Sequence, residues 1–327
     1  MKVLHLYNIA AVLLSVLLAV AGCKPSKGRD TQVPQIDFCA DSAYRYVQEQ
    51  VAFGARVPGS GAHRDCAAYL RRQLERFGAQ VEVQQGQLPD YKGDMQTVVN
   101  IIGRYESRHT QKRILLAAHW DSRPWADQEE DYADRQMPVP GANDGASGIG
   151  VLLEIARQLG LRDSTGAVDI VLFDCEDMGT PDFYTEKERE DTWCLGSQLW
   201  SREQRHRNKE YQYGIVLDMV GAPDAVFPKE YHSLEFARQY TEKIWRIAEK
   251  QGYTQYFKDQ IAYPITDDHY YVNTIAGIPC VDIIHYDTQS MTGFAHWWHT
   301  RLDDMRNISP ATLDAVGRVV MATIDSH

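Results

Sequence analysis

Four short runs of apolar, mostly β-branched residues constrain the fold of this 327-residue chain more than any other feature. The runs are RILLAAH (113–119), VDIVLFD (168–174), YGIVLDMVG (213–221) and IPCVDIIH (278–285). Long helical patterns separate several of them, including 146–159 and 233–251. Nearly continuous apolar strands that alternate with helices indicate a largely parallel sheet covered on both faces. We therefore expect an α/β fold: a three-layer helix–sheet–helix sandwich with a central mixed, mostly parallel twisted sheet.

The part of the chain before these runs extends the same pattern. Residues 41–53 and 62–77 have the spacing of amphipathic helices, and 80–87 and 96–105 alternate in the manner of strands. With 44% hydrophobic residues the chain can bury a large core. We therefore expect residues 38–327 to form a single catalytic α/β domain.

The N-terminus has the features of an export signal. A basic start at Lys2 precedes an almost wholly apolar run at 9–20, which is too short for a comfortable membrane span. The run ends in VAGC, which resembles a bacterial lipobox whose cysteine, here Cys23, is lipidated. These features predict a signal peptide at 1–22, a polar tether at 23–37 and an exported, periplasmic or cell-envelope lipoprotein held to the membrane only through that cysteine. A plain signal peptide or an uncleaved anchor is the alternative.

Export would permit disulfides, and five cysteines remain after Cys23. Because five is odd, at least one has no partner within the chain. Cys280 lies in an apolar run and is the expected free thiol. The candidate pairs are Cys175 with Cys194 and Cys39 with Cys66, although sequence alone does not fix connectivity.

The net charge of −11 bears on partners. An acidic chain is poorly suited to nucleic acid, so we expect no nucleic-acid partner. Nothing in the sequence demands an oligomer, and we expect a monomer.

Acidic residues and a histidine follow the predicted strands where those strands end. They are His119 and Asp121 after the first run, Asp174, Glu176 and Asp177 after the second, Asp218 in the third, and Asp144 just before the helix at 146–159. Ligands of parallel α/β sheets bind at the carboxyl ends of the strands. Carboxylates buried together at one edge repel one another unless a cation or a shared proton compensates, so a divalent metal is the economical explanation. Singly, Asp144 could be a helix N-cap, His119 a core histidine and Asp218 a turn acid.

Zinc binds histidine nitrogen and carboxylate oxygen, and catalytic zinc sites keep one position open. Asp144, Asp177 and His299 would supply three ligands from three separate loops. Glu176 lies beside a ligand without being one, which makes it the candidate general base. We therefore expect one Zn²⁺ per chain.

Seven motifs occur in the order found in the zinc aminopeptidase-like superfamily: LLAAHWDSR, GANDGASGIGVLLEIAR, LFDCED, LGSQLW, LDMVGA, TDDHYY and WHT. Within it, the chain from about residue 40 onward resembles bacterial glutaminyl-peptide cyclotransferases (glutaminyl cyclases). The resemblance implies zinc ligation by Asp144, Asp177 and His299 and a catalytic base at Glu176. It also implies that Asp218 and Asp267 share a hydrogen-bond network with that base and the substrate amine.

Three residues depart from the pattern of the cyclases. Asp177 stands where many relatives have glutamate, which shortens one ligand arm but keeps the carboxylate. Gly145 replaces a serine of the animal enzymes, and Asp282 replaces a histidine in the fourth strand. These differences leave the reaction plausible and change the details of the proton network.

The octapeptide GFAHWWHT (293–300) bears on the substrate. In the cyclases a tryptophan directly before the metal histidine packs on the glutaminyl side chain, and Trp298 has that position. Phe294 matches an aromatic residue four positions earlier, and Trp193 could cover the other side as the 180–192 loop folds over. Alternatively, Trp298 only packs His299 into its rotamer, and Trp193 only packs.

The resemblance implies an aminoacyltransferase that converts the N-terminal glutamine of peptides and proteins to pyroglutamate and releases ammonia. The close alternative is a co-catalytic di-zinc aminopeptidase that hydrolyses N-terminal residues. Its five ligand positions correspond to His119, Asp144, Asp177, Asp218 and His299, so counting ligands does not exclude it. The tryptophan before His299 and the doubled acid of TDDHYY favour the cyclase. A non-enzymatic receptor-like domain is disfavoured because no ligand and no base is missing.

Overall fold

The computed structural model of the protein describes residues 38–108, 110, 112–162 and 166–326. The predicted signal peptide, the lipidated Cys23 and the tether fall outside the described residues and stay predictions. Within the described part, no helix combines the length and the apolarity that crossing a membrane requires. Ile36–His327 forms one compact unit.

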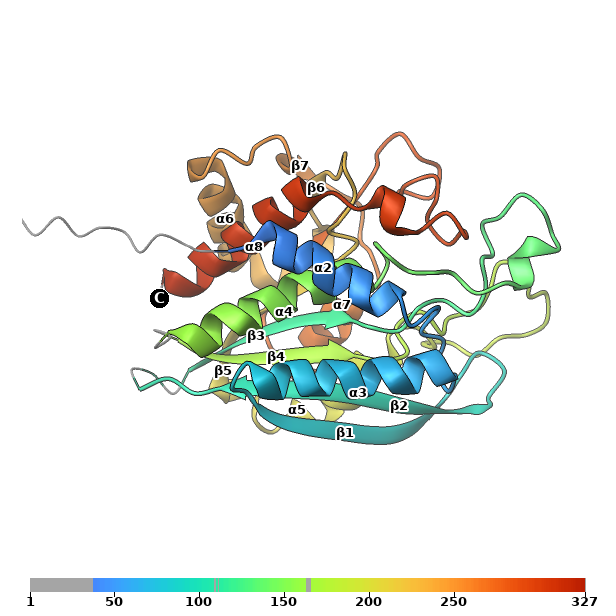
Figure 1. The fold of residues 1–327 in the computed structure, drawn as a ribbon, viewed down its shortest axis with the longest axis horizontal. Coiled ribbons are helices and arrows are strands. Elements are labelled where there is room, and N and C mark those ends of the chain that lie inside the picture. Colours follow the sequence, from blue (N-terminus) through green and yellow to red (C-terminus); the bar gives the residue numbers. More distant parts are fainter. Residues whose placement is uncertain (1–37, 109, 111, 163–165, 327) are drawn as a thin grey trace, which may run out of the picture. The chain divides into compact units, whose positions relative to one another are not determined.

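A six-stranded sheet with the order β1-β2-β4-β3-β5-β8 occupies the centre of this unit (Figure 1). Its strands are β1 (Gln80–Pro89), β2 (Met95–Tyr105), β3 (Arg113–His119), β4 (Ala167–Phe173), β5 (Tyr211–Asp218) and β8 (Cys280–Ile284). β3 runs parallel to β4 and to β5, and β5 runs parallel to β8. β1 and β2 are antiparallel to their neighbours. The predicted mixed, mostly parallel sheet is therefore confirmed.

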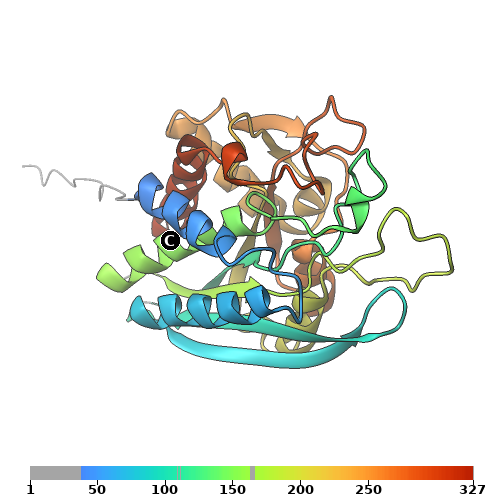
Figure 2. The ribbon, with the colours of Figure 1, turned by 45° about the vertical axis from the view of Figure 1, so that its right-hand side comes forward.

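Helices cover both faces of the sheet, which explains why β3 and β4 are buried along their whole length. Alternate side chains of a strand point to opposite faces. Ile114 and Leu116 of β3 belong to a core shared with the helices α2 (Ala40–Val51), α3 (Gly61–Arg76), α4 (Ala146–Leu161), α6 (Tyr231–Lys250) and α8 (Pro310–Asp325). Leu115 and Ala117 instead pack with Trp200 of α5 (Leu195–Gln204) on the other face. Figures 1 and 2 show the resulting three layers.

The elements expected from periodicity agree with the structure to within a few residues. The first apolar run is β3 itself, and the patterns at 146–159 and 233–251 are α4 and α6. Sequence periodicity missed α5, α8, the short helix α7 (Asp268–Tyr271) and a second sheet formed by β6 (Phe227–Lys229) and β7 (Phe257–Ile261). A strand or helix of three or four residues is too short to show a period. The start of α8 could have been recognised, because Pro310 follows Ser309 at its first turn.

The cysteine pairs considered from the sequence are not formed. Cys39, Cys66, Cys175, Cys194 and Cys280 are all free thiols in the described structure. The sulfur of Cys175 lies 3.9 Å from the carbonyl oxygen of Thr97, whereas that of Cys194 lies 3.1 Å from Oε1 of Glu176. The two side chains thus contact different groups. Cys66 is buried in the main core, and Cys280 is buried and free as expected.

The close approach of α4 to the sheet depends on Gly148. A methyl group at this position would overlap the carbonyl oxygen of Leu217 and lie 2.9 Å from Cβ of Ala118. We expect Gly148→Ala to lower the free energy of unfolding by about 1–3 kcal/mol, because both obstructing groups belong to the packed sheet. Denaturant titration measures this change.

Gly61→Ala is the matched control for Gly148→Ala. Gly61 lies in the first turn of α3, and a Cβ there would have an ordinary contact of 3.9 Å with Arg64. We expect its unfolding free energy to stay the same or rise slightly. Equal stability of the two variants would show that α4 can move away from β5 without cost.

Candidate functional site

All nine residues predicted for the site line one pocket of 550 Å³ at the carboxyl ends of the parallel strands. They are the predicted metal ligands Asp144, Asp177 and His299, the predicted catalytic acids Glu176, Asp218 and Asp267, and the aromatic residues Trp193, Phe294 and Trp298. They come from strand ends and from several loops that the strand order of the sheet brings to one edge. The structure thus brings the nine side chains together, and their individual roles stay predictions.

His299 lies at the spacing of a tetrahedral zinc site from each of the other two predicted metal ligands. Nε2 of His299 lies 3.2 Å from Oδ1 of Asp177 and 3.6 Å from Oδ2 of Asp144. Ligand atoms around a tetrahedral zinc, with bonds of about 2.0–2.1 Å, lie roughly 3.3 Å apart. Oδ2 of Asp177 is buried and has no hydrogen-bond partner among the described residues. Buried carboxylate oxygens without partners are costly, so these residues fit a divalent cation.

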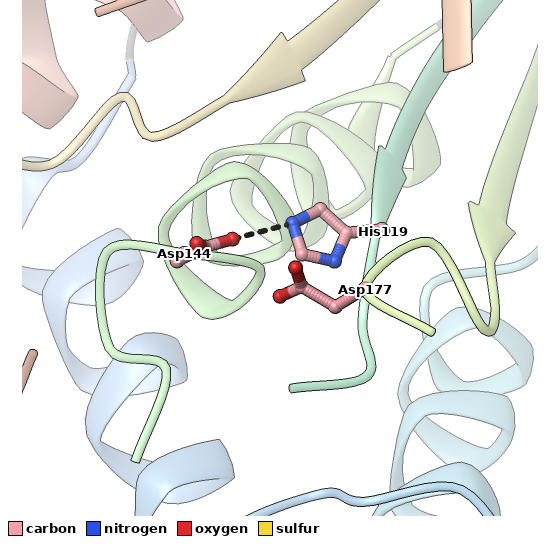
Figure 3. A group of neighbouring side chains, drawn as sticks. All are labelled: His119, Asp144 and Asp177. Carbon is pink, nitrogen blue, oxygen red and sulfur yellow. Dashed lines mark ion pairs between the residues drawn. The ribbon is translucent and has the colours of Figure 1, made fainter. Parts of the chain in front are cut away.

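A second histidine, His119, also contacts Asp144, and Figure 3 shows it beside Asp144 and Asp177. Its Nε2 is 3.0 Å from Oδ1 of Asp144 and 3.2 Å from Oδ1 of Asp218. His119, Asp144 and Asp177 offer ligand atoms that all lie within 4.8 Å of one another. Although burial opposes it, the neighbouring carboxylates raise the pKa of His119 well above its usual value. Asp144 thus faces both histidines, and the side-chain distances accommodate either one ion or two.

Two buried residues that sequence reasoning did not single out hold His299 and Asp177 in place. Oδ1 of Asp127 lies 3.3 Å from Nδ1 of His299 and accepts a hydrogen bond of 2.9 Å from Nε of Arg123. Nη1 of Arg123 also donates to the carbonyl oxygen of Asp177 over 3.1 Å. A carboxylate behind a metal-binding histidine fixes the orientation of its ring. The sequence signal that could have identified this pair is an arginine and an aspartate, Arg123 and Asp127, four residues apart and just after a strand end.

Two more buried acids fix the loops that carry the predicted ligands. Asp303 accepts hydrogen bonds from the backbone N–H groups of Asn143 and Asp144, over 2.8 and 3.0 Å. Asp121 accepts those of Glu176 and Asp177, over 3.1 and 3.2 Å. Because Asp303 follows His299 closely in the sequence, these hydrogen bonds tie the segment that carries His299 to the loop that carries Asp144. No local pattern marks Asp303 for this role.

Glu176 has the environment of a general base. It lines the pocket, and 9% of its surface is exposed. Burial, followed by the charge of Asp177, raises its pKa well above the usual value. Burial and the charge of Asp218 likewise raise the pKa of Asp267 to about 6. A carboxylate with a raised pKa accepts and returns protons more readily near neutral pH.

Aromatic rings stand beside the predicted metal ligands. The ring of Trp298 stacks on His299 with centroids 3.5 Å apart, and Phe294 lies 4.6 Å from Trp298. The ring of Trp193 is parallel to that of His299, with centroids 6.2 Å apart. The guanidinium of Arg123 lies 4.7 Å from the ring centroid of Trp193. These contacts suit a substrate wall and also suit simple packing of His299.

Asp174, after β4, and Asp282, within β8, do not line this pocket. Asp174, expected at the edge with the others, accepts a hydrogen bond from Val99 N over 2.7 Å and pairs with His63 Nε2 at 2.8 Å. It thus joins α3 to the sheet. Asp282 is fully buried in β8, with Oδ2 3.4 Å from Nδ1 of His269.

The sheet and its pocket of histidines and carboxylates define a protein of the zinc-exopeptidase type. A Zn-dependent exopeptidase from Parabacteroides distasonis has the same fold, with a TM-score of 0.86 and 47% identity over 89% of this chain and 99% of that one. The chain belongs to peptidase family M28, whose family model matches residues 100–324.

Some of the similar proteins are named as glutaminyl cyclases and others as aminopeptidases. Tannerella forsythia glutaminyl cyclase has a TM-score of 0.85 and 46% identity, covering 89% of this chain and 99% of its own. A leucine aminopeptidase precursor from Bacteroides thetaiotaomicron has a TM-score of 0.84 and 46% identity, covering 89% and 98%. The mouse glutaminyl-peptide cyclotransferase-like protein is 23% identical over 90% of this chain and 81% of its own.

The aminopeptidase YwaD of Bacillus subtilis (strain 168) is 27% identical over 70% of this chain. The matched part spans 44% of the length of that relative. The resemblance to bacterial glutaminyl cyclases inferred from the motifs is confirmed by these comparisons.

Proposed function

We propose that this protein is a zinc-dependent glutaminyl-peptide cyclotransferase. It converts the N-terminal glutamine of a peptide or protein to pyroglutamate and releases ammonia. The observation that carries the proposal is that Trp298 and Phe294 line the same pocket as Glu176 and the three predicted metal ligands. Similarity to glutaminyl cyclases over nearly the whole length of their chains supports it.

One zinc ion per chain would be held by Asp144, Asp177 and His299. The spacing of these ligand atoms and the partnerless Oδ2 of Asp177 support this assignment. When bound, zinc acts as a Lewis acid that polarises the side-chain amide carbonyl of the substrate and stabilises negative charge on its oxygen. His119, whose Nε2 contacts both Asp144 and Asp218, would then donate its Nε2 hydrogen to Asp218.

The chain's own residues orient the substrate and move one proton. Trp298 and Phe294 form a wall against the glutamine side chain, and Asp218 and Asp267 face its α-amine. Glu176 accepts a proton from the amine as the amine nitrogen forms a bond to the side-chain amide carbon. Glu176 then returns the proton to the departing nitrogen, the carbon–nitrogen bond of the amide breaks, and ammonia leaves. Because the nucleophile belongs to the substrate, the pocket contributes mainly orientation.

A di-zinc aminopeptidase is the second candidate. The position of Asp144 between His119 and His299 favours it, because a carboxylate that faces two histidines can bridge two ions. In that case Asp218 would be a metal ligand and would not contact the substrate amine.

One assay distinguishes the two candidates. Purified protein is incubated with a glutamine-initiated peptide and with a leucine-initiated peptide, while ammonia, free amino acid and zinc per chain are measured. Ammonia without free amino acid, from protein with one zinc, supports the cyclase. Release of leucine by protein with two zinc ions supports the peptidase.

Trp298→Ala is expected to lower kcat/KM for a glutamine-initiated peptide by about 10–100-fold, because the side chain loses a large apolar contact. Zinc per chain is expected to stay the same. Kinetics with the peptide and metal analysis of the same preparation measure both quantities.

Trp298→Phe is the matched variant, because it keeps an aromatic wall and should retain most of the activity. If Trp298→Ala loses zinc together with activity, the indole serves to pack His299 and does not bind substrate.

A further inference from the structure

Cys194 is fully buried at the start of α5 and lies against the predicted base. Its backbone N–H donates to the carbonyl oxygen of Glu176 over 2.9 Å, and that of Leu195 donates to the carbonyl oxygen of Cys175 over 3.0 Å. These two bonds join the start of α5 to the loop after β4. The left-handed backbone of Cys175 and Cys194, with φ of 55° and 56°, shows that both turns are held in an uncommon conformation.

The side chain of Cys194 contacts the carboxylate of Glu176. Its Sγ lies 3.1 Å from Oε1, well within hydrogen-bond distance for sulfur. Burial and the carboxylates around it raise the pKa of Cys194 well above its usual value, so the thiol keeps its proton and donates. Oε2 of Glu176 accepts no hydrogen bond from the described residues, which leaves it for the substrate.

We propose that Cys194 is a positioning residue for Glu176, which it holds through the Sγ–H···Oε1 hydrogen bond while Oε2 takes the proton of the substrate. Cys194 does not line the pocket, so a substrate bound there would not touch it. This inference rests on the proposed role of Glu176 in the cyclase reaction.

The chemistry of a thiol suits this position. A thiol is a weak donor, so it restrains one oxygen without holding the carboxylate as firmly as a charged or strong donor would. A small misplacement of a catalytic group can cost a large factor in rate, so even a weak restraint matters. A merely structural cysteine would need only its volume, because its sulfur would then contact apolar groups.

Serine and alanine substitutions separate the hydrogen bond from the volume. Cys194→Ala removes the donor, and we expect kcat on a glutamine-initiated peptide to fall about tenfold, with KM changed by less than about twofold. Cys194→Ser restores a hydrogen-bond donor in a side chain nearly as small as that of alanine. We expect its kcat to lie within about threefold of that of the unchanged protein. Zinc per chain and thermal midpoint are measured on each preparation.

Cys175→Ala is the matched control. Cys175 is equally buried and adjacent to Glu176 in sequence, but its sulfur faces the carbonyl oxygen of Thr97. We expect its kcat to stay unchanged. Equal kcat for Cys194→Ala and Cys194→Ser, or an equal loss in Cys175→Ala, would overturn the assignment.

Infrared spectroscopy tests the contact without activity. The difference between the spectra of the unchanged protein and Cys194→Ala isolates the S–H stretching band of Cys194. We expect Glu176→Ala to move this band to higher frequency, because the hydrogen bond to the carboxylate is lost. An unmoved band overturns the positioning role. If instead the band moves but the unchanged protein makes no ammonia from glutamine-initiated peptides, the proposed function fails and the contact stands.

Discussion

Glu176→Gln is expected to lower kcat on a glutamine-initiated peptide by at least about 100-fold, the lower end of what general acid–base catalysis contributes. Glutamine has nearly the same size as glutamate, and it cannot accept the amine proton. Zinc content should not change, because Glu176 is not one of the three predicted ligands. Initial rates of ammonia release and metal analysis of the same sample measure both effects.

The control for Glu176→Gln is Glu190→Gln, which makes the same chemical change at an exposed position outside the pocket. We expect it to keep full activity. A Glu176→Gln protein with a substantial fraction of the original rate would remove Glu176 as the base. Asp267, whose pKa is raised to about 6, would then be the next carboxylate to examine.

His299→Ala is expected to lose both zinc and activity. The imidazole lies 3.2 Å from Asp177 and 3.6 Å from Asp144, so its removal takes one of three predicted ligands and leaves two buried carboxylates without a cation. The variant should contain less than about a tenth of the zinc of the unchanged protein after dialysis, by analogy with the 10–100-fold loss of metal affinity from weaker perturbations of metal sites. Metal analysis and the ammonia assay measure the two losses.

His296→Ala is the matched control for His299→Ala, because it removes the other histidine of the same octapeptide. His296 is exposed and lines a different cavity. We expect it to keep its zinc and its rate. Zinc retained in His299→Ala at the full amount would contradict the predicted ligand set and would favour His119 with Asp144 and Asp177, whose ligand atoms all lie within 4.8 Å of one another.

Sequence reasoning placed the predicted site residues at one edge of the sheet because strand ends are local features. The apolar runs mark the strands, the polar residues that follow mark their ends, and the parallel arrangement brings those ends to one edge. For this reason the sequence alone groups Asp144, Glu176, Asp177 and Asp218. The same reasoning misplaced Asp174, whose carboxylate does not line the pocket and instead pairs with His63 and accepts a hydrogen bond from the backbone of Val99.

The residues that hold the site in place could not be found in this way. Asp303 and Asp127 act through contacts with groups elsewhere in the chain, namely the backbone of Asn143 and the ring of His299. The thiol of Cys194 was considered for a disulfide with Cys175, yet it contacts Glu176. The direction of a side chain at a turn depends on local φ and ψ and on the packing around it, and neither can be read from residue types.

The sequence by itself determined the fold class, the edge of the sheet that carries the pocket, and the side chains available for chemistry there. These follow from the periods of apolar residues and from the short range of strand-end motifs. Only the tertiary structure decided which acids face one another, that Asp144 lies between two histidines, and that the cysteines are free. The reason is physical: periodicity reports which face of an element is buried, whereas the contacts between side chains of distant loops depend on distances that the packed chain alone defines.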